Sequence, residues 1–447
     1  MRVIALDIGT TKICASVVDG ETGIVLDTKS EQNRYLPLSN KYDRVQDAEE
    51  IFTISCEMIH KLHRRYSPIS CIGITGQMHG ILYVDDTGNA LSPLYTWEDR
   101  SGDMPCGTDT YAGILTKKTG YLLATGYGAV TLFTHMQREA LPQNAGKICT
   151  VPDYVAMRLT GKKQPLLHAS MAHSIGLYNS KSGSFDEEAL ICGNLPVRLF
   201  PEVTQENAVL GHNENGIPVT VSIGDNQASV AGAVQDAEKS VCVNIGTGGQ
   251  ISILDNKTKQ FSGMTQRPYF DEKILWVGAS LCGGSAYAML ERFFRDILNM
   301  AGVKTSHMYD CMDKVLAQCE VLSDPLLINT QFAGTRENSE QRGWIKNIST
   351  GNFTPAHMMQ GVLRGTVQEL YDIVAPEALM TKKILVASGN GVRRNIHMQE
   401  QLKEIFQMPL CIPRQNEEAA FGAALFALTA IGHFPTMEQA QRFVQYQ

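Results

Sequence analysis

Two glycine-threonine turns stand about half a chain apart, and the residue types in both are suited to binding phosphate. The first spans residues 7–11 (Asp-Ile-Gly-Thr-Thr) and the second spans residues 244–249 (Asn-Ile-Gly-Thr-Gly-Gly). Glycine lets the backbone approach a phosphate and direct its N–H groups at the oxygens, and threonine adds hydroxyl donors. One such turn alone is weak evidence, because short glycine motifs also occur without a ligand. The repeat indicates two similar domains with a ligand between them.

Asp225 has two candidate roles. It stands between a β-prone run and an alanine-rich segment, so the local sequence favours a helix N-cap whose hydrogen bond is worth about 1 kcal/mol. If the two turns hold a triphosphate, Asp225 could instead accept the proton of a hydroxyl nucleophile that attacks the γ-phosphorus. A general base of this kind typically contributes a rate factor on the order of a hundred to ten thousand. The local residues leave both roles open.

Asp7 opens the first turn and is the candidate magnesium ligand. Mg²⁺ usually keeps several waters and takes only one or two protein carboxylates beside phosphate oxygens, so one aspartate at a phosphate turn suffices. A turn-forming role for the Asp7 side chain is the alternative. The second turn has the uncharged Asn244 in the matching place. We therefore expect a single metal site, beside Asp7 in the first turn.

Other polar residues could bind a polyhydroxyl compound. A predicted strand over residues 69–75 leads into Gln77, Met78 and His79, and the ends of strands are where α/β folds tend to place ligands. Neutral side chains such as Gln77, His79 and Asn226 are suited to hydrogen bonding with hydroxyl groups. Residues 97–100 (Trp-Glu-Asp-Arg) add an aromatic face beside a carboxylate, although a surface loop with an ion pair explains them equally well.

Strands and helices are predicted around these residues. The pattern of strand, glycine turn and strand occurs twice in the sequence. The β-prone runs 3–6 and 13–18 flank the first turn, and the runs 241–243 and 251–254 flank the second. A strand over residues 383–387 precedes a third glycine turn at residues 388–391. Helices are predicted to begin after three capping residues, Asp47, Asp153 and Thr354. Another helix is predicted from Ser285, with Ala286, Met289, Leu290, Phe293 and Ile297 on one face.

Length and composition limit the class of protein. A chain of 447 residues exceeds what one hydrophobic core usually supports, and the polar stretch 235–239 marks a boundary between domains at 1–235 and 236–447. The net charge of -7 gives no general affinity for polyanions, so we expect no nucleic-acid partner.

Cysteine usage and hydropathy indicate a cytoplasmic protein. The 11 cysteines are scattered singly, and none of them has the spacing of a zinc-binding motif. This pattern fits a reducing compartment. We expect no signal peptide and no membrane partner, because the longest apolar stretch, residues 419–431, is too short for a bilayer and predicts a buried helix. The oligomeric state stays open, with a homodimer as one expectation.

Taken in order, the motifs resemble the FGGY carbohydrate kinase family, which belongs to the actin-like ATPase fold group. Residues 7–11 look like the first phosphate motif of the family, residues 244–249 like the second, and residues 388–395 like the adenosine motif. Asp225 stands where the family has its catalytic base. Residues 283–284 and 417–424 look like parts of the family's second domain, so the similarity runs nearly end to end.

The resemblance implies an α/β fold of two ribonuclease-H-like domains with an active-site cleft between them. It implies phosphorylation of a small-molecule sugar, with ATP and Mg²⁺ as cofactors, Asp225 as the base and Asp7 at the metal. Together with the residue types above, it predicts nucleotide contacts at Thr10, Thr11, Lys12, Gly246, Thr247, Gly284, Gly389, Asn390 and Gly391. The predicted sugar contacts are Gln77, Met78, His79, Trp97, Asp99 and Asn226.

The acceptor sugar is narrowed by similarity within the family. Residues 76–80 are similar to ketose kinases and differ from glycerol kinases, and residues 96–100, 127–131 and 168–178 look most like sedoheptulose kinases. Sedoheptulose is therefore the expected acceptor, and xylulose or another ketose or polyol is the alternative. A different class, an actin-like assembly or chaperone ATPase, has no need of such a sugar-binding surface.

Overall fold

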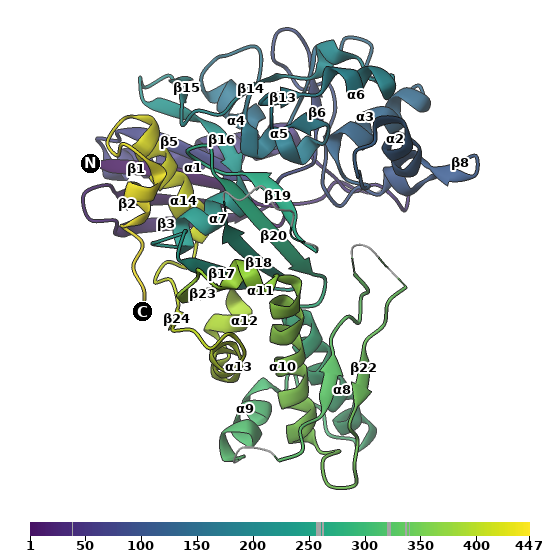
Figure 1. Ribbon diagram of the computed structural model, residues 1–447. Coiled ribbons are helices and arrows are strands. Elements are labelled where there is room, and N and C mark those ends of the chain that lie inside the picture. Colours follow the sequence, from purple (N-terminus) through teal and green to yellow (C-terminus); the bar gives the residue numbers. More distant parts are fainter. Residues whose placement is uncertain (38, 256–260, 262, 320–322, 336–337, 339) are drawn as a thin grey trace. The chain divides into compact units, whose positions relative to one another are not determined.

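The computed structural model describes residues 1–37, 39–255, 261, 263–319, 323–335, 338 and 340–447. By its internal contacts the chain divides into two compact units (Figure 1). Unit 1 comprises Met1–Gln235, Arg267–Ile274 and Glu417–Gln445, and unit 2 comprises Asp236–Gln266, Leu275–Asn416 and Tyr446–Gln447. Two stretches that the sequence analysis assigned to the C-terminal domain therefore pack with unit 1.

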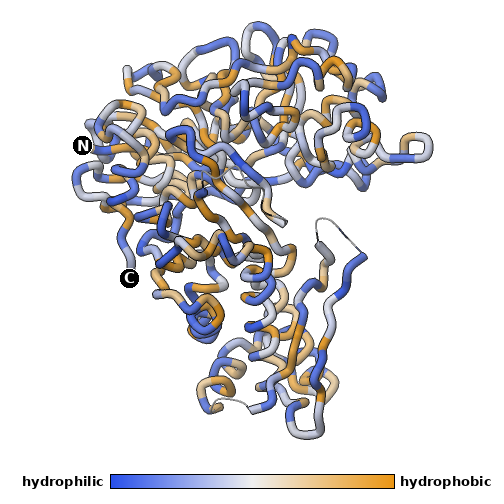
Figure 2. Tube along the Cα trace, in the orientation of Figure 1, coloured by the Kyte–Doolittle hydropathy of each residue, from blue (hydrophilic) through white to orange (hydrophobic). Residues whose placement is uncertain are grey.

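A six-stranded mixed sheet forms the centre of unit 1. Its order is β15 (Val209–His212), β16 (Pro218–Gly224), β5 (Cys71–Gly76), β1 (Arg2–Ile8), β2 (Lys12–Asp19) and β3 (Val25–Gln32). The strands β1 and β2 are buried and hydrophobic along most of their length (Figure 2). Because β1, β5 and β16 are parallel neighbours, their carboxyl ends lie at the same edge of the sheet.

Helices and short strands complete unit 1. The helices are α1 (Ala48–Tyr66), α2 (Tyr111–Thr119), α3 (Gly128–Gln137), α4 (Val151–Leu159), α5 (Ala169–Ile175), α6 (Glu187–Cys192), α7 (Asp225–Ala233), α14 (Glu418–Ala430) and α15 (Met437–Gln441). The short strand pairs are β4 (Val45–Gln46) with β7 (Leu94–Tyr95), β6 (Leu82–Val84) with β10 (Lys147–Cys149), β8 (Pro105–Cys106) with β9 (Asp109–Thr110), β11 (Leu166–His168) with β14 (Glu202–Thr204), and β12 (Tyr178–Asn179) with β13 (Ser184–Phe185).

The helix α14 is buried against the sheet of unit 1, as its apolar composition predicted. It contacts β1, β5 and α7, so residues 417–424 do not belong to unit 2 as the sequence analysis expected. Two glycines permit the close approach of α7 and α14. A Cβ atom at Gly422 would lie 1.9 Å from the Ala228 carbonyl oxygen, and one at Gly232 would lie 1.9 Å from the Glu418 carbonyl oxygen.

Unit 2 repeats the strand arrangement of unit 1. Its sheet has the order β19 (Thr265–Pro268), β20 (Ile274–Ser280), β18 (Gly249–Leu254), β17 (Ser240–Ile245), β23 (Ile384–Ser388) and β24 (Leu410–Cys411). The strand β17 pairs antiparallel with β18 and parallel with β23, as β1 does with β2 and β5. Next outward, β20 matches β3 and β24 matches β16. The predicted repeat is confirmed and extends to five strands.

The helices of unit 2 include one whose predicted apolar face is only partly buried. They are α8 (Gly284–Met300), α9 (Tyr309–Gln318), α10 (Pro355–Ile373), α11 (Pro376–Leu379), α12 (Asn390–Arg393) and α13 (Ile396–Phe406), and β21 (Leu327–Asn329) pairs with β22 (Trp344–Lys346). On α8 the side chains of Ala286 and Leu290 are buried, but Phe293 is 54% exposed. Met289 and Ile297 are exposed as well, because the packing in unit 2 covers only part of the apolar face.

Capping residues define several helix starts. Asp47 caps α1 and Thr354 caps α10, as predicted. The helix α4 begins earlier than predicted, since Thr150 is its cap and Asp153 lies in the first turn. Asp153 is buried there and accepts hydrogen bonds from the hydroxyls of Thr150 and Ser222.

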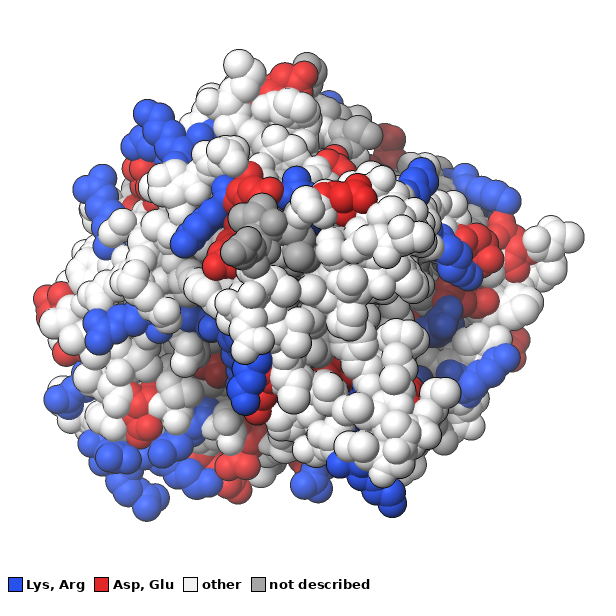
Figure 3. Space-filling model, turned by 90° about the horizontal axis from the view of Figure 1, so that it is seen from below, with Lys and Arg blue, Asp and Glu red and all other residues white. Residues whose placement is uncertain are grey.

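On the face shown in Figure 3, basic and acidic side chains are interspersed. Among the residues that the structure describes, no helix combines the length and the apolar character needed to cross a bilayer.

Candidate active site

Three candidate functional residues of unit 1 lie at the carboxyl ends of three neighbouring strands. In the register of the sheet, Ile8 on β1 and Gly224 on β16 both align with Gly76 on β5. Asp7, Gln77 and Asp225 are each one residue from these aligned positions. The fold therefore places the candidate metal ligand, the first candidate sugar contact and the candidate base at one edge of one sheet.

Asp225 is the first residue of α7, and Gly224 is the N-cap, so the interpretation of Asp225 as the cap is wrong. Burial raises the pKa of Asp225 to about 6, while the positive charge of Arg267 and the backbone N–H groups of Asn226 and Asp225 itself act to lower it. The residue as a whole is partly exposed. At neutral pH it is mostly ionised yet more basic than an ordinary aspartate, which suits a general base.

Asp7 is a carboxylate in unfavourable surroundings for a negative charge. Burial raises its pKa to about 7, and the charges of Asp225 and Glu417 add to this increase while Lys12 opposes it. A bound cation would relieve the repulsion, so the surroundings of Asp7 fit a magnesium ion. Within the described part of the chain there is no cluster of three or more His, Cys, Asp or Glu side chains arranged for a metal. An ion held at Asp7 would take its other ligands from phosphate oxygens and water.

Lys12, a predicted nucleotide contact, is engaged by Glu417. Its ammonium nitrogen lies 2.7 Å and 2.9 Å from the two carboxylate oxygens of Glu417, which is the N-cap of α14. Both side chains are partly exposed. Sequence reasoning assigned Glu417 to the other domain, so it missed this partner of the first turn.

A hydrogen-bonded network joins the first turn to the predicted sugar contacts. The Trp97 indole donates to the Thr10 hydroxyl over 2.9 Å, and that hydroxyl lies 3.4 Å from Gln77 Oε1. Gln77 Nε2 donates to Gln46 Oε1 over 2.9 Å, and Gln46 Nε2 donates to the Thr10 carbonyl over 2.7 Å. Gln46 is 0% exposed. Thr10, Gln77 and Trp97 thus belong to one network, in which Thr10 and Gln77 are linked by Gln46, a residue that no local sequence signal marked.

Thr11, which follows Thr10 in the first turn, is exposed. Its carbonyl accepts a hydrogen bond from the backbone N–H of Asn33, over 3.0 Å. The Asn33 side chain in turn donates to the Gly9 carbonyl and to Gln46. The backbone of the first turn is therefore fixed by buried amides, and its threonines lie at its surface.

Met78 lies beside the start of α7, and His79 lies against Ser174 of α5. Met78 is buried, and a Cβ atom at Gly224 would lie 2.7 Å from its sulfur. His79 has a positive φ of 72°, and its backbone N–H donates to the Ser174 hydroxyl. Its Nδ1 lies 2.8 Å from the Ser174 carbonyl oxygen. A carbonyl can only accept, so Nδ1 carries the proton; if the ring is neutral, Nε2 is an acceptor.

Asp99 differs from the other predicted sugar contacts. It is 1% exposed, and its carboxylate accepts hydrogen bonds from the backbone N–H groups of Arg44 and Ser101, over 3.2 Å and 3.0 Å. Burial raises the pKa of Asp99, and these hydrogen bonds oppose the increase. The carboxylate stabilises the loop that presents Trp97, which is 47% exposed.

Asn226 is buried beside an arginine that the sequence analysis did not single out. Arg267 Nη1 lies 3.3 Å from Asn226 Oδ1. The arginine is 41 positions further along the chain, beyond the boundary predicted at residue 235, and no motif surrounds it.

The predicted nucleotide contacts of unit 2 form a second group, around the carboxyl end of β17. The turn between β17 and β18 is bonded to the start of α8, because Gly284 N–H donates to the Gly246 carbonyl over 2.8 Å and Ser285 N–H donates to the Thr247 carbonyl over 3.1 Å. Gly389 has a φ of 89°, and a Cβ atom there would lie 2.5 Å from the Ile245 carbonyl oxygen. Only glycine fits this approach.

The third glycine turn continues directly from Gly389. Asn390 is the first residue of α12, and a Cβ atom at Gly391 would lie 2.8 Å from Ile245. The Asn244 amide donates to the Ser388 hydroxyl across the parallel strands, over 3.0 Å. The structure therefore brings the residues 246–247, 284 and 389–391 together as a largely backbone-lined group.

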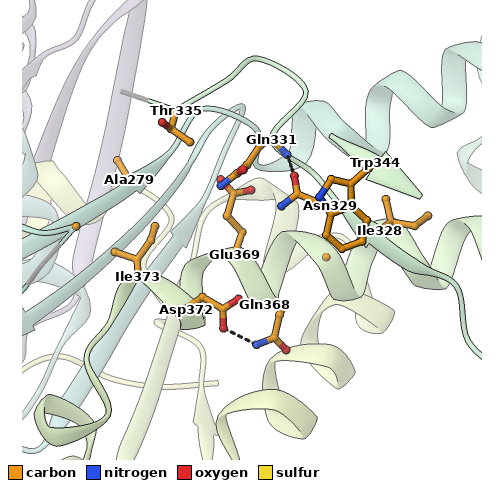
Figure 4. A pocket seen from close by; sticks show the side chains of 12 residues that line it. Ala279, Ile328, Asn329, Gln331, Thr335, Trp344, Gln368, Glu369, Asp372 and Ile373 are labelled. Atoms are coloured by element: carbon orange, nitrogen blue, oxygen red, sulfur yellow. Dashed lines mark hydrogen bonds between the residues drawn. The ribbon is translucent and has the colours of Figure 1, made fainter. Parts of the chain in front are cut away.

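Unit 2 also has a pocket of about 420 Å³, which contains none of the predicted site residues (Figure 4). Trp344 and Glu369 are among the side chains at its wall, with Asp372 and Gln368 hydrogen-bonded to each other. The remaining lining residues are Gly263, Ala279, Ile328, Asn329, Gln331, Thr335, Gly365 and Ile373.

Sequence comparison connects these observations with known proteins. The family model described as "FGGY family of carbohydrate kinases, N-terminal domain" matches residues 2–242. The chain is similar to the sedoheptulokinase of Homo sapiens, with 26% identity over 473 residues that cover 95% of this chain and 97% of that protein.

Structural comparison shows the same fold in solved kinases. The ligand-bound xylulose kinase of Lactobacillus acidophilus has a TM-score of 0.83 at 19% identity, covering 100% of this chain and 92% of that chain. Plasmodium falciparum glycerol kinase with ADP has a TM-score of 0.82 at 18% identity, covering 99% and 93%. These similarities confirm the predicted fold class, α/β with two domains of the actin-like ATPase type.

Proposed function

The chain belongs to the FGGY family of carbohydrate kinases and is an ATP-dependent sugar kinase, and we propose that its acceptor is sedoheptulose, which it converts to sedoheptulose 7-phosphate. The observation that carries this choice is the similarity to a sedoheptulokinase over nearly the full length of both chains. Residues 76–80 support it, because their neutral polar side chains suit a ketose.

Asp225 is the proposed base. The sugar hydroxyl oxygen would form a bond to the γ-phosphorus of ATP, the bond from that phosphorus to the β–γ bridging oxygen would break, and the hydroxyl proton would pass to the Asp225 carboxylate. ADP is then the leaving product. The pKa of Asp225 near 6 supports the role, since the group is ionised at neutral pH and able to accept a proton.

The glycine turns would hold the nucleotide. Thr10, Thr11 and Lys12 would contact phosphate oxygens in unit 1, and in unit 2 the turn at residues 246–247 would contact phosphate while Gly284 and residues 389–391 would contact the rest of the nucleotide. Asp7 would hold Mg²⁺ together with phosphate oxygens. When bound, this ion neutralises negative charge on the transferring phosphoryl group.

The sugar would be recognised by uncharged groups. Gln77, Asn226 and the acceptor nitrogen of His79 would hydrogen-bond to hydroxyls, while Met78 and Trp97 would pack against the carbon skeleton. Asp99 would act through the loop that it stabilises. Mg²⁺ and a cytoplasmic homodimer are also part of the proposal, as is a domain boundary at residue 235 from which residues 267–274 and 417–445 return to the first domain.

A substrate panel tests the acceptor. ADP release is measured with sedoheptulose, xylulose, ribulose, fructose, glycerol and gluconate, and the phosphorylated carbon of the product is identified by NMR. Sedoheptulose should give the highest kcat/KM. A higher kcat/KM for xylulose would show that xylulose is the acceptor, and the protein would still be a sugar kinase. ATP hydrolysis without any sugar acceptor, together with ATP-dependent sedimentation of filaments, would favour the assembly ATPase.

A further inference from the structure

Arg267 is a charged residue held in the interior. It is 7% exposed, although arginine is rarely buried without a specific role. The segment that follows it is anchored in unit 1, because the ring of Phe270 packs with the rings of His168 and Phe426. Asp271 accepts hydrogen bonds from Asn207 and from the backbone N–H of Met437. The position of Arg267 in unit 1 is therefore set by several independent contacts.

Two hydrogen bonds fasten this segment to the first turn of α7. Arg267 Nη1 donates to Asn226 Oδ1 over 3.3 Å, and Gln227 Nε2 donates to the Pro268 carbonyl over 3.0 Å. Gln227 is fully buried. Asn226 and Gln227 directly follow the proposed base, Asp225, so Arg267 is held against the residues that flank it.

The contact with Arg267 decides which way the Asn226 amide faces. A guanidinium group only donates hydrogen bonds, so the atom of Asn226 that it contacts must be the oxygen. The NH₂ group is then the donor end of the Asn226 side chain. A sugar contact made by Asn226 is therefore a donated hydrogen bond to an oxygen of the acceptor.

The charge of Arg267 also bears on the base. The charges of Asp225, Glu417 and Lys12 act on Asp7 on β1, and the positive charge of Arg267 on β19 acts on Asp225. His173 on α5 faces Arg267, and burial together with that positive charge lowers the pKa of His173 to about 4. His173 is thus neutral at physiological pH, and Arg267 is the cation that acts on Asp225 from this side.

Resting on the proposed kinase function, we propose that Arg267 is a positioning residue of the acceptor site. It orients the Asn226 amide so that its NH₂ group donates to an acceptor oxygen next to the hydroxyl that Asp225 deprotonates, and its positive charge acts on the Asp225 carboxylate. The inference concerns the sugar and leaves nucleotide binding unchanged.

A double-mutant cycle tests this role. The variants Arg267→Met, Asn226→Ala and their combination are compared by kcat and KM for the sugar and for ATP. Arg267→Met should lower kcat/KM for the sugar by about tenfold or more while the KM for ATP changes by less than about twofold. In the Asn226→Ala background, the same substitution should cost clearly less than in the wild type, because the part of the effect that passes through Asn226 is already absent and only the charge acting on Asp225 is lost. Full additivity of the two effects would overturn the proposal.

Conservative variants separate orientation from charge. Arg267→Gln keeps a donor for Asn226 without the charge, and Arg267→Lys keeps the charge with a different geometry. Either should recover part of the loss seen in Arg267→Met, and no recovery in both would contradict the proposal. These two variants also serve as the test if Arg267→Met does not fold. Arg198→Met is the matched control, since Arg198 donates to the Ala145 carbonyl and should leave the KM for the sugar unchanged.

The wild type separates this inference from the proposed function. If the wild type phosphorylates none of the sugars, the proposed function fails. If it is active and the two substitutions act additively, only the role of Arg267 fails.

Discussion

Lys12 and Glu417 form an ion pair between residues 405 positions apart, with the ammonium nitrogen 2.7 Å and 2.9 Å from the two carboxylate oxygens. The pair links the first glycine turn to the start of α14. Glu417 also contributes to the raised pKa of Asp7. The position of the one predicted cationic contact for the nucleotide is therefore set by the far end of the chain.

Glu417→Gln should raise the KM for ATP, because Lys12 loses the carboxylate that holds it beside the first turn. We expect an increase of about threefold or more, with the KM for the sugar unchanged within about twofold. Steady-state kinetics at saturating sugar measures the effect. Glu404→Gln is the control, since Glu404 pairs with Arg364 on the surface of unit 2. Equal KM values for ATP in both variants would show that the ion pair does not position Lys12.

Asp225→Asn should retain binding of ATP and sugar by calorimetry but lose at least about a hundredfold in kcat. In the wild type, kcat/KM should fall as pH decreases through about 6, because protonation of Asp225 removes the base. Asp153→Asn is the control, since burial raises the pKa of Asp153 to about 7 but its carboxylate is hydrogen-bonded to Thr150 and Ser222. An acid limb that shifts with Asp153→Asn would contradict the assignment to Asp225.

Sequence patterns predicted the elements that carry the site and missed residues that complete it. The strands around both turns and the caps Asp47 and Thr354 are encoded by neighbouring residues, so periodicity and capping rules find them. Arg267 and Glu417 reach the site only through tertiary contacts, and Gln46 lies on a strand of two residues. No local pattern marks such residues, because their role depends on which distant segments pack together.

Asp7→Asn should make the protein more stable at alkaline pH while weakening its use of magnesium. The folded pKa of Asp7 is about 7, above its model-compound value of 3.8. Stability from this group is full below about pH 4 and is lost as pH rises through about 7, since the buried carboxyl must then ionise in place. We expect the Tm at pH 8 to rise by about 2 °C or more, with a smaller gain at pH 5.

The same variant should require more magnesium for half-maximal activity, because the proposed metal carboxylate is absent. Asp85→Asn is a control of opposite sign. Hydrogen bonds from Thr87 and Asn89 lower the pKa of Asp85 to about 2, so its replacement should reduce stability at neutral pH. An unchanged magnesium requirement in Asp7→Asn would count against a metal at this residue.

Gly422→Ala should destabilise unit 1, because the added Cβ atom would lie 1.9 Å from the Ala228 carbonyl oxygen on the facing helix. The obstacle is backbone, so α7 and α14 must separate, and overpacking of this kind costs about 1–3 kcal/mol. Chemical denaturation followed by far-UV circular dichroism measures the loss, and Gly351→Ala is the control because the nearest atom to its Cβ position is a side-chain oxygen 4.0 Å away. Because α7 begins at Asp225, Gly422→Ala should also have a lower kcat than the wild type. If its stability and kcat equal those of Gly351→Ala, the packing of the two helices does not depend on this close approach.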